Sequence, residues 1–325
     1  MGLTNFPNGI TSMGIPIMGG GFPMGLTKTF FVDYGNGSDG VNAKANSATR
    51  PWKTIDKAYA ALTTNKNEGI ALMGNSSHAL TEMLTVAKSR VHIFGYDPGG
   101  RMYGQNAKVS LGITGVATNL GTIQNTGVRN SFSNMKISNA DTVSEGLFTF
   151  VEAGEYTVID RCELYKSAHL STSLAAELLM NGDSATVSNC IIGSNANAIG
   201  AGSFIRPCVM LTRETITGKV ARDVTFINTQ MWRWAANTAN AFVWSTLATD
   251  VERKMEFRDC LFNVTKKSTA VPAVAIGGAA AFTAGEILLT GNTAENGCTA
   301  LATQTGIFSC LPTYAADGGS GAQAT

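Results

Sequence analysis

The sequence is poor in charged residues. Only 14% of its 325 residues are Asp, Glu, Lys or Arg, against roughly a quarter in typical soluble proteins. This shortage argues against a mainly helical fold, because surface helices usually carry many Glu and Lys. No run of Lys or Arg exceeds two residues and the formal net charge is +1, so the basic patch of a nucleic-acid or anionic-membrane binder is missing. We expect neither nucleic acid nor a membrane as a partner.

Long hydrophobic segments and paired cysteines are also missing. The longest apolar stretches, such as residues 271–282, are shorter than the ~20 residues that cross a bilayer. The six cysteines include no C-x-x-C pair. We therefore expect reduced thiols rather than disulfides, and no metal site.

Catalytic and cofactor motifs are scarce. The three histidines lie near no G-x-S-x-G or reactive-cysteine signature, so a nucleophilic triad is not expected. A literal G-x-G-x-x-G at Gly35, Gly37 and Gly40 is followed by VNAKANSATRP, which is a poor helix opening. The glycines therefore indicate turns rather than a dinucleotide site, and no cofactor is expected.

Glycine, by contrast, is abundant, with 36 residues, and a short pattern recurs beyond residue 125. Each copy has an apolar residue, a small polar pair and a further apolar residue. The intervals between copies are 27, 28, 39, 31 and 32 residues, a period that indicates a solenoid. Because the copies are rich in β-branched and aromatic residues, they favour strands over helices. The sequence predicts an all-β fold, a right-handed parallel β-helix. The copies begin at Phe132, Ile159, Val187, Phe226, Phe257 and Leu289.

Three of these copies have cysteine as their fourth residue. In stacked coils the same side-chain type would occupy the same inward position, one strand spacing of ~4.8 Å per coil. Cys162, Cys190 and Cys260 are therefore predicted to form a structural ladder in the core.

The chain divides into three predicted parts. Residues 1–28 hold seven Gly and three Pro among apolar residues, which predicts an extended arm that needs a partner surface. Residues 29–312 are predicted to form the β-helix domain, with an N-terminal cap at 29–100 that includes a capping helix at 54–64. Residues 313–325 are predicted to form a flexible C-terminal tail. The arm residues expected to contact a partner are Phe6, Pro7, Ile10, Ile15, Ile17, Met18 and Phe22.

The start of the predicted domain carries a resemblance. FFVDYGNGSDGVNA, then ATRPWKTIDKAYAAL, then IALMGNSSHALTEMLTVAKSRVHIFGYDPG resembles the N-terminal cap and first coils of pectate-lyase-like right-handed parallel β-helix proteins. In that superfamily an extended strand, a G-S-D-G turn, a Pro-aromatic-x-T-I helix and an apolar strand before Gly recur in this order. The resemblance implies the fold, but this scaffold carries lyases, hydrolases, adhesins and inert structural proteins.

The arm carries a second resemblance. GLTNFPNGITSMGIPIMGGG is similar to the starts of tailed-phage virion proteins in which a Gly-rich apolar arm precedes a β-helix. This resemblance implies a structural bacteriophage protein, not an enzyme. It implies a capsid decoration or cement protein that binds and stabilises the head shell through its arm and β-helix flank. The expected partners are the major capsid protein and neighbouring copies of itself, as a trimer, on the capsid surface of a virion. We expect synthesis in the bacterial cytoplasm, because residues 1–28 have no basic segment followed by an apolar core.

The same fold leaves another function open, a tailspike or tail-fibre module that binds or cleaves host surface polysaccharide. Glycoside hydrolysis needs two carboxylates roughly 5 to 9.5 Å apart. Asp160 and Glu163 are the candidate pair, with Asp183, Glu256 and Asp259 as further candidates, although scattered acids on a solenoid are also ordinary solubilising residues.

Tryptophans supply a candidate contact surface. Strand alternation places Trp232 and Trp234 on the same face, with Trp244 near them in the sequence. Facing outward, they would suit carbohydrate stacking or a protein interface. Facing inward, they would fill a wide coil, and the sequence leaves both orientations open. The longest interval between copies, from Val187 to Phe226, precedes this group and predicts a projecting loop as a contact site.

Overall fold

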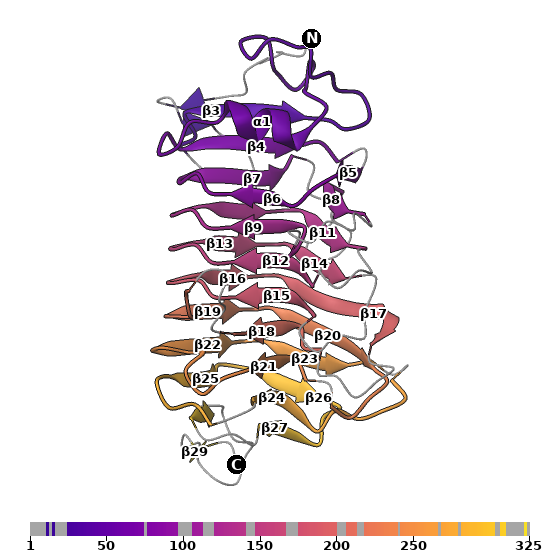
Figure 1. The fold of residues 1–325 in the computed structure, drawn as a ribbon, viewed down its shortest axis with the longest axis vertical. Coiled ribbons are helices and arrows are strands. Elements are labelled where there is room, and N and C mark those ends of the chain that lie inside the picture. The colour runs from indigo at the N-terminus through magenta and orange to yellow at the C-terminus, as the bar shows by residue number, and fades with distance from the viewer. Residues whose placement is uncertain are drawn as a thin grey trace.

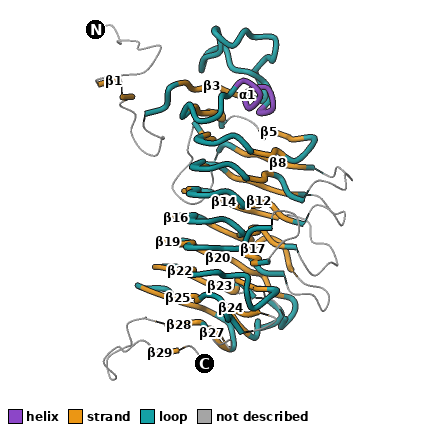
Figure 2. Tube along the Cα trace, turned by 60° about the vertical axis from the view of Figure 1, so that its left-hand side comes forward, coloured by secondary structure: helices purple, strands orange, loops and turns teal. Residues whose placement is uncertain are grey.

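The strands stack in successive coils along one long axis, as a parallel β-helix (Figure 1). Seen from another side, each coil lies directly over the previous one (Figure 2). No helix in the described part of the chain is both long and apolar enough to cross a membrane. This computed structural model describes residues 11–12, 15–16, 25–74, 77–96, 106–112, 120–140, 147–166, 175–199, 206–212, 218–239, 241–265, 268–278, 281–302, 306–309 and 322–323.

Three sheets, here called sheets I, II and III, run along the stack, and the chain visits them in that order in each coil. Sheet I contains β3 (Lys28–Val32), β4 (Glu68–Leu72), β7 (Val91–Gly95), β10 (Ser131–Ser133), β13 (Val158–Asp160), β16 (Thr186–Ser188), β19 (Val224–Ile227), β22 (Lys254–Arg258), β25 (Glu286–Thr290), β28 (Ile307–Ser309) and β29 (Ala322–Gln323). Sheet II contains β5 (Ser77–Leu80), β8 (Lys108–Leu111), β11 (Lys136–Asn139), β14 (Glu163–Lys166), β17 (Ile191–Ile199), β20 (Gln230–Ala235), β23 (Leu261–Val264) and β26 (Ala294–Asn296). Sheet III contains β6 (Leu84–Val86), β9 (Ile123–Asn125), β12 (Phe148–Glu152), β15 (Ala176–Met180), β18 (Val209–Leu211), β21 (Val243–Ser245), β24 (Val274–Gly278) and β27 (Ala300–Ala302).

The predicted repeat sets the register of sheet I. Its six starting residues are all buried, and each is the direct pairing partner of the next: Phe132 with Ile159, Ile159 with Val187, Val187 with Phe226, Phe226 with Phe257, and Phe257 with Leu289. The stacked-rung prediction is confirmed. Within this column the Phe226 and Phe257 rings stack with centroids 4.7 Å apart.

The turn from sheet I to sheet II explains the small polar pair of the repeat. Its second residue adopts a left-handed backbone, which Asn and Asp tolerate better than most residues. Arg161, at φ 51°, is the exception to that preference. The others are Asn134, Asn189, Asn228 and Asp259, with φ between 45° and 55°, and Gly291, with φ 64°.

The cysteine ladder is in register but is not continuous. The Cys162 backbone N–H donates to the Cys190 sulfur at 3.4 Å, whereas Thr229 occupies the rung between Cys190 and Cys260. Threonine fits there because its hydroxyl donates to the Ile227 carbonyl at 3.1 Å, much as the Cys260 thiol donates to Arg258 at 3.4 Å. The cysteines are free thiols wherever the structure describes them, and Cys310 lies outside the described residues.

A helix lies at the N-terminal end of the stack, where the sequence predicts one over residues 54–64. It is α1 (Ile55–Ala61), and the Thr54 hydroxyl accepts a hydrogen bond from the Lys57 N–H at 3.3 Å as its N-cap. Asp39, from the G-S-D-G turn, accepts hydrogen bonds from the backbone N–H groups of Lys53 and Thr54. The turn and the start of the helix are thereby tied together.

Both predicted ends are only partly described. In the predicted arm, β1 (Thr11–Ser12) pairs antiparallel with β2 (Ile15–Pro16), so Ile15 lies on a strand. At the other end β29 pairs antiparallel with β28, against the parallel rule of the rest of sheet I. The division at residues 28 and 312 stays a prediction. The remaining predicted arm contacts, which lie outside the described residues, are Phe6, Pro7, Ile10, Ile17, Met18 and Phe22.

Replacing Phe226 with alanine removes one ring from the buried column, which leaves a cavity between two coils. We expect the free energy of unfolding to fall by about 3–5 kcal/mol, measured by urea denaturation. Val158→Ala is the control on the same sheet, because Val158 is 41% exposed, and it should change stability by no more than about 0.5 kcal/mol. Equal effects for the two variants would contradict the assignment of Phe226 to the core.

Candidate functional site

The corner where the chain passes from sheet III to sheet I carries a column of charged residues. Glu155 pairs with Asp183, and Asp183 pairs with Arg222, as bridge partners on successive coils. Glu252 follows on the next coil, beside the bridge between Ala221 and Val251. These four residues, here called the charged column, therefore repeat at the strand spacing of ~4.8 Å.

Tight turns force these side chains outward. The residues that follow them, Tyr156, Ser184 and Asp223, have φ between 50° and 53°, the left-handed conformation that reverses the chain. Gly182 precedes Asp183, and a Cβ at Gly182 would lie 2.9 Å from Glu152 Cγ, closer than real side chains approach. Glycine at this point therefore lets the corner pack directly on the interior while the charged residue points to solvent.

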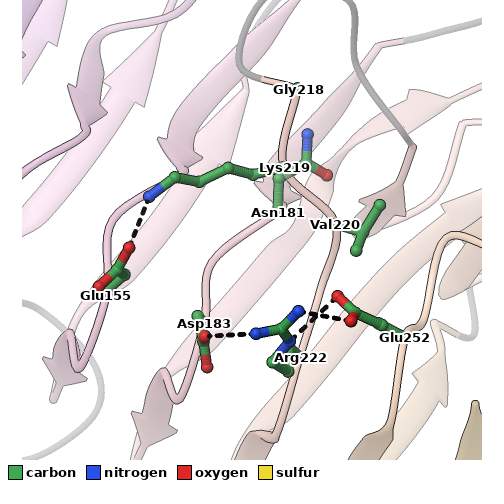
Figure 3. A pocket seen from close by; sticks show the side chains of 8 residues that line it. All are labelled: Glu155, Asn181, Asp183, Gly218, Lys219, Val220, Arg222 and Glu252. Atoms are coloured by element: carbon green, nitrogen blue, oxygen red, sulfur yellow. Dashed lines mark hydrogen bonds and ion pairs between the residues drawn. The ribbon is translucent and has the colours of Figure 1, made fainter.

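Two separate sets of ion pairs hold the column, one between Lys219 and Glu155 and one that joins Asp183, Arg222 and Glu252 (Figure 3). Lys219 Nζ lies 3.1 Å from Glu155 Oε1, and Arg222 Nη1 lies 3.5 Å from Asp183 Oδ2. Arg222 also donates two hydrogen bonds to Glu252, from Nε to Oε2 at 3.0 Å and from Nη2 to Oε1. These hydrogen bonds raise the pKa of Arg222. These side chains are 29–42% exposed, and such pairs contribute only about 0–1 kcal/mol each to stability. Fold stability therefore does not explain why so many charges meet at this corner.

A cleft of about 230 Å³ opens beside the column. One wall is the chain from Gly218 to Val220, in the coil that has the longest interval between repeats. The sequence predicted a contact loop in this coil, and the coil does supply part of the cleft. The residues that line the cleft are Glu155, Asn181, Asp183, Gly218, Lys219, Val220, Arg222 and Glu252.

Asn181 is the unusual member of this lining. Its side chain is 1% exposed, and neither Nδ2 nor Oδ1 has a hydrogen-bond partner among the residues that the structure describes. Its backbone N–H donates to the Glu152 carbonyl at 2.8 Å. The main chain of Asn181 is therefore hydrogen-bonded to a described residue, whereas its side-chain amide is not. Figure 3 shows this amide among the side chains that line the cleft. A buried polar group without a partner costs roughly 1–3 kcal/mol, and such a group facing a cleft is typical of a binding site.

Behind the cleft lies a buried acid, Glu152. Its carboxylate accepts hydrogen bonds from Asn125 Nδ2 at 3.0 Å, from the Gly154 N–H at 2.7 Å and from the Thr157 hydroxyl at 3.0 Å. Burial raises the pKa of Glu152 to about 7, although these hydrogen bonds and the charge of Lys219 oppose the rise. Lys219 therefore forms an ion pair with Glu155 at the cleft, and its charge also opposes the rise in the pKa of the buried Glu152.

The predicted catalytic carboxylates, Asp160 and Glu163, lie on different sheets. Asp160 lies on sheet I and accepts hydrogen bonds from Ser188, Asn189 and Arg161 at 2.7–2.8 Å. Burial alone would raise the Asp160 pKa, but these hydrogen bonds outweigh it and leave the pKa lowered. Glu163 lies on sheet II and pairs with Lys136 at 2.6 Å. The two carboxylates thus lie on two sheets with separate partners.

The tryptophans divide between two sheets. Trp232 and Trp234 lie on the outer face of β20 and are half-buried, while Arg233 between them points inward and pairs with Glu177 at 2.9 Å. Trp232 and Trp234 therefore lie on the same face of the strand, as expected, and that face points outward rather than into the coil. Trp244 lies on sheet III instead, where it packs against an apolar cluster that includes Phe148 and Met210. The three tryptophans therefore do not form one surface.

Among the cleft residues, the sequence offered Asp183 as a candidate carboxylate but not the others, although a signal was present. Glu155, Asp183 and Arg222 each lie four residues before a repeat start, at Ile159, Val187 and Phe226. Extending the repeat upstream would have aligned these three charges. In the described part of the chain, no three His, Cys, Asp or Glu side chains group as a metal site requires.

Comparison with known proteins identifies the fold. No protein-family model matches the chain, and no curated protein matches its sequence. Among solved structures, a rhamnogalacturonan lyase has a TM-score of 0.59 at 10% identity, covering 81% of this chain and 67% of that one. Pectate lyase Pel9A has a TM-score of 0.54 at 14% identity, covering 82% of this chain and 62% of that one. A pectin methylesterase from Aspergillus niger has a TM-score of 0.53 at 12% identity, covering 89% and 90%. The resemblance to pectate-lyase-like parallel β-helix proteins is confirmed for the fold.

These neighbours correct one expectation. The sequence indicated a protein that is not an enzyme, yet the three structural neighbours named above are two lyases and an esterase. The prediction was wrong to exclude catalysis, because it treated a missing motif as a missing activity. At 10–14% identity the likeness shows the fold alone, so the activity itself is a matter for proposal.

The buried Glu152 predicts a pH dependence of stability. Its pKa in the folded protein is raised from 4.5 to about 7, so the folded state holds a proton that the unfolded state releases in this range. Stability from this group is complete below pH 4.5 and is lost as the pH rises to about 7, by about 3 kcal/mol in all. Denaturant unfolding across this range should show a steeper decline for the wild type than for Glu152→Gln. Parallel profiles for the two proteins would contradict the shift.

Proposed function

We propose that this protein is a β-helix module of the tailspike or tail-fibre type, which binds a bacterial surface polysaccharide at the cleft beside the charged column. The observation that carries the proposal is the Asn181 amide, which lines the cleft and whose two polar atoms have no hydrogen-bond partner in the part of the chain that the structure describes. Sugar hydroxyls donate and accept hydrogen bonds, so they complement an amide and the carboxylates around it. The polysaccharide-directed names of the fold neighbours support this class of ligand.

The size and surroundings of the cleft suit one unit of a polymer. Its volume of about 230 Å³ is below the roughly 300–1,000 Å³ of pockets that hold drug-sized molecules. A single sugar ring fits this space better than an oligosaccharide does. Tyr156, next to Glu155, is 54% exposed and offers an aromatic surface where a neighbouring ring can pack. The column runs along the β-helix axis, so a chain of sugars can continue across further coils.

Cleavage of the bound polymer falls within the proposal. The Glu155 and Asp183 backbones are one strand spacing, ~4.8 Å, apart, which allows their carboxylates the roughly 5–5.5 Å separation of a retaining pair. This pair replaces Asp160 and Glu163 as the candidate for hydrolysis. Release of reducing ends, measured beside binding, reports whether the pair acts on the polymer.

Replacing Asn181 with leucine, which has a similar shape, tests the binding site. We expect affinity for a bound polysaccharide to fall at least tenfold, about 1.4 kcal/mol. The fold should be unharmed or stabilised by about 1 kcal/mol, because an apolar group replaces unsatisfied polar atoms. Affinity electrophoresis against purified capsular and O-antigen polysaccharides measures the first effect, and thermal unfolding measures the second.

The control for this test is Asn296→Leu, the same exchange on sheet II, where Asn296 is exposed and hydrogen-bonded to Asn263. This variant should bind as the wild type does. Unchanged binding by Asn181→Leu, or no binding of any polysaccharide by the wild type, would refute the proposal.

A capsid decoration protein is the second candidate, favoured by the resemblance of the Gly-rich arm to the starts of head decoration proteins. An arm of 28 residues can span up to roughly 90 Å when extended, enough to cross onto a neighbouring capsid subunit. The major capsid protein, a trimer and the virion surface remain predictions that belong to this candidate.

Truncation tests the second candidate. Removing residues 1–28 should abolish stoichiometric binding to purified expanded capsids, measured by co-sedimentation, while thermal unfolding of the β-helix stays unchanged. Normal decoration by the truncated protein would rule out the arm as the anchor.

A further inference from the structure

We infer that the cleft selects an uncharged sugar with adjacent free hydroxyls and rejects a uronate. This inference rests on the proposed function and specifies the substrate class of the same site. Its basis is the arrangement of charge around Asn181.

The first step is the charge balance of the cleft. Its lining has three carboxylates, on Glu155, Asp183 and Glu252, and two cations, on Lys219 and Arg222. The formal sum is therefore one negative charge. A ligand that brings its own carboxylate enters a site that is already acidic.

The second step concerns Arg222, which would have to recognise a uronate. Planar carboxylates are bound best by two parallel N–H groups of a guanidinium. In Arg222 the Nε and Nη2 groups already hold Glu252, and Nη1 faces Asp183. Lys219 is likewise committed to Glu155. An incoming carboxylate must displace one of these acids, and the displaced acid then remains beside it.

The third step is the chemistry of the Asn181 amide. The amide offers a donor, Nδ2, and an acceptor, Oδ1, and neither is hydrogen-bonded to any described residue. A carboxylate can accept from Nδ2 but turns a second negative oxygen toward Oδ1. Two adjacent hydroxyls can satisfy both atoms of the amide, because one hydroxyl accepts a hydrogen bond from Nδ2 while the other donates one to Oδ1. The amide therefore favours a pair of hydroxyls over a carboxylate group, and the charges of the first two steps set the preference for a neutral sugar.

The experiment compares two classes of probe at matched length. Neutral oligosaccharides of glucose, mannose, galactose and rhamnose are titrated by calorimetry beside oligogalacturonates. We expect at least one neutral series to bind, with affinity lost in Asn181→Leu, and the acidic series to bind at least tenfold more weakly. Tighter binding of oligogalacturonate at a site that is lost in Asn181→Leu would overturn the inference and leave the proposed function standing. Absence of binding by both classes would overturn the proposed function and the inference with it.

A charge variant tests the reason for the selectivity. Glu252→Gln releases the Nε and Nη2 groups of Arg222 and removes one negative charge, so the ratio of neutral to acidic affinity should fall on the order of tenfold. Glu286→Gln is the matched control, since it makes the same charge change on β25, outside the cleft, and should leave the ratio unchanged. An equal change in both variants, or none in Glu252→Gln, would contradict the role of the committed arginine. Circular dichroism and thermal unfolding establish that each variant is folded.

Discussion

Hydrogen bonding between successive coils is the constraint on which the rest of this molecule depends. Each coil satisfies its backbone N–H and C=O groups with the coils above and below, so every strand must keep the register of its neighbours. Residues at equivalent positions are thereby fixed at one strand spacing. The buried column from Phe132 to Leu289 and the charged column at the corner are two results of this single rule, one facing inward and one facing outward.

The interior is not uniformly apolar, and its polar groups lie near the corners. Glu152 is held by Asn125 and Thr157, and Arg233 is paired with Glu177 deep in the stack. A buried carboxylate needs partners on all sides, and its position fixes the corner from within. The charged column lies on the outer side of the corner that Glu152 supports. The geometry of the cleft is thus set partly by residues that no ligand touches.

The sequence carried enough information for the fold because the signals were local and repeated. The apolar residue at the start of each copy and the turn that follows recur often enough to fix both the strand type and the register of sheet I. The sequence pattern identified the three cysteines of the ladder. It did not indicate that Thr229 occupies the position between Cys190 and Cys260. The cleft residues were missed for another reason. Glu155 and Glu252 are 97 positions apart in the chain, and each alone is an ordinary surface acid. The stacking of coils brings them to one corner, and the unequal intervals between repeats obscure this alignment in the sequence.

The antiparallel pairing of β29 with β28 has a consequence for assembly. A parallel stack ends in a row of unpaired backbone groups, onto which another copy could add its own first strand and extend the molecule into a fibre. At the C-terminal end of sheet I that edge is taken by a segment of the same chain running in the opposite direction. An incoming parallel strand must first remove this segment, so the protein carries its own barrier to end-to-end growth.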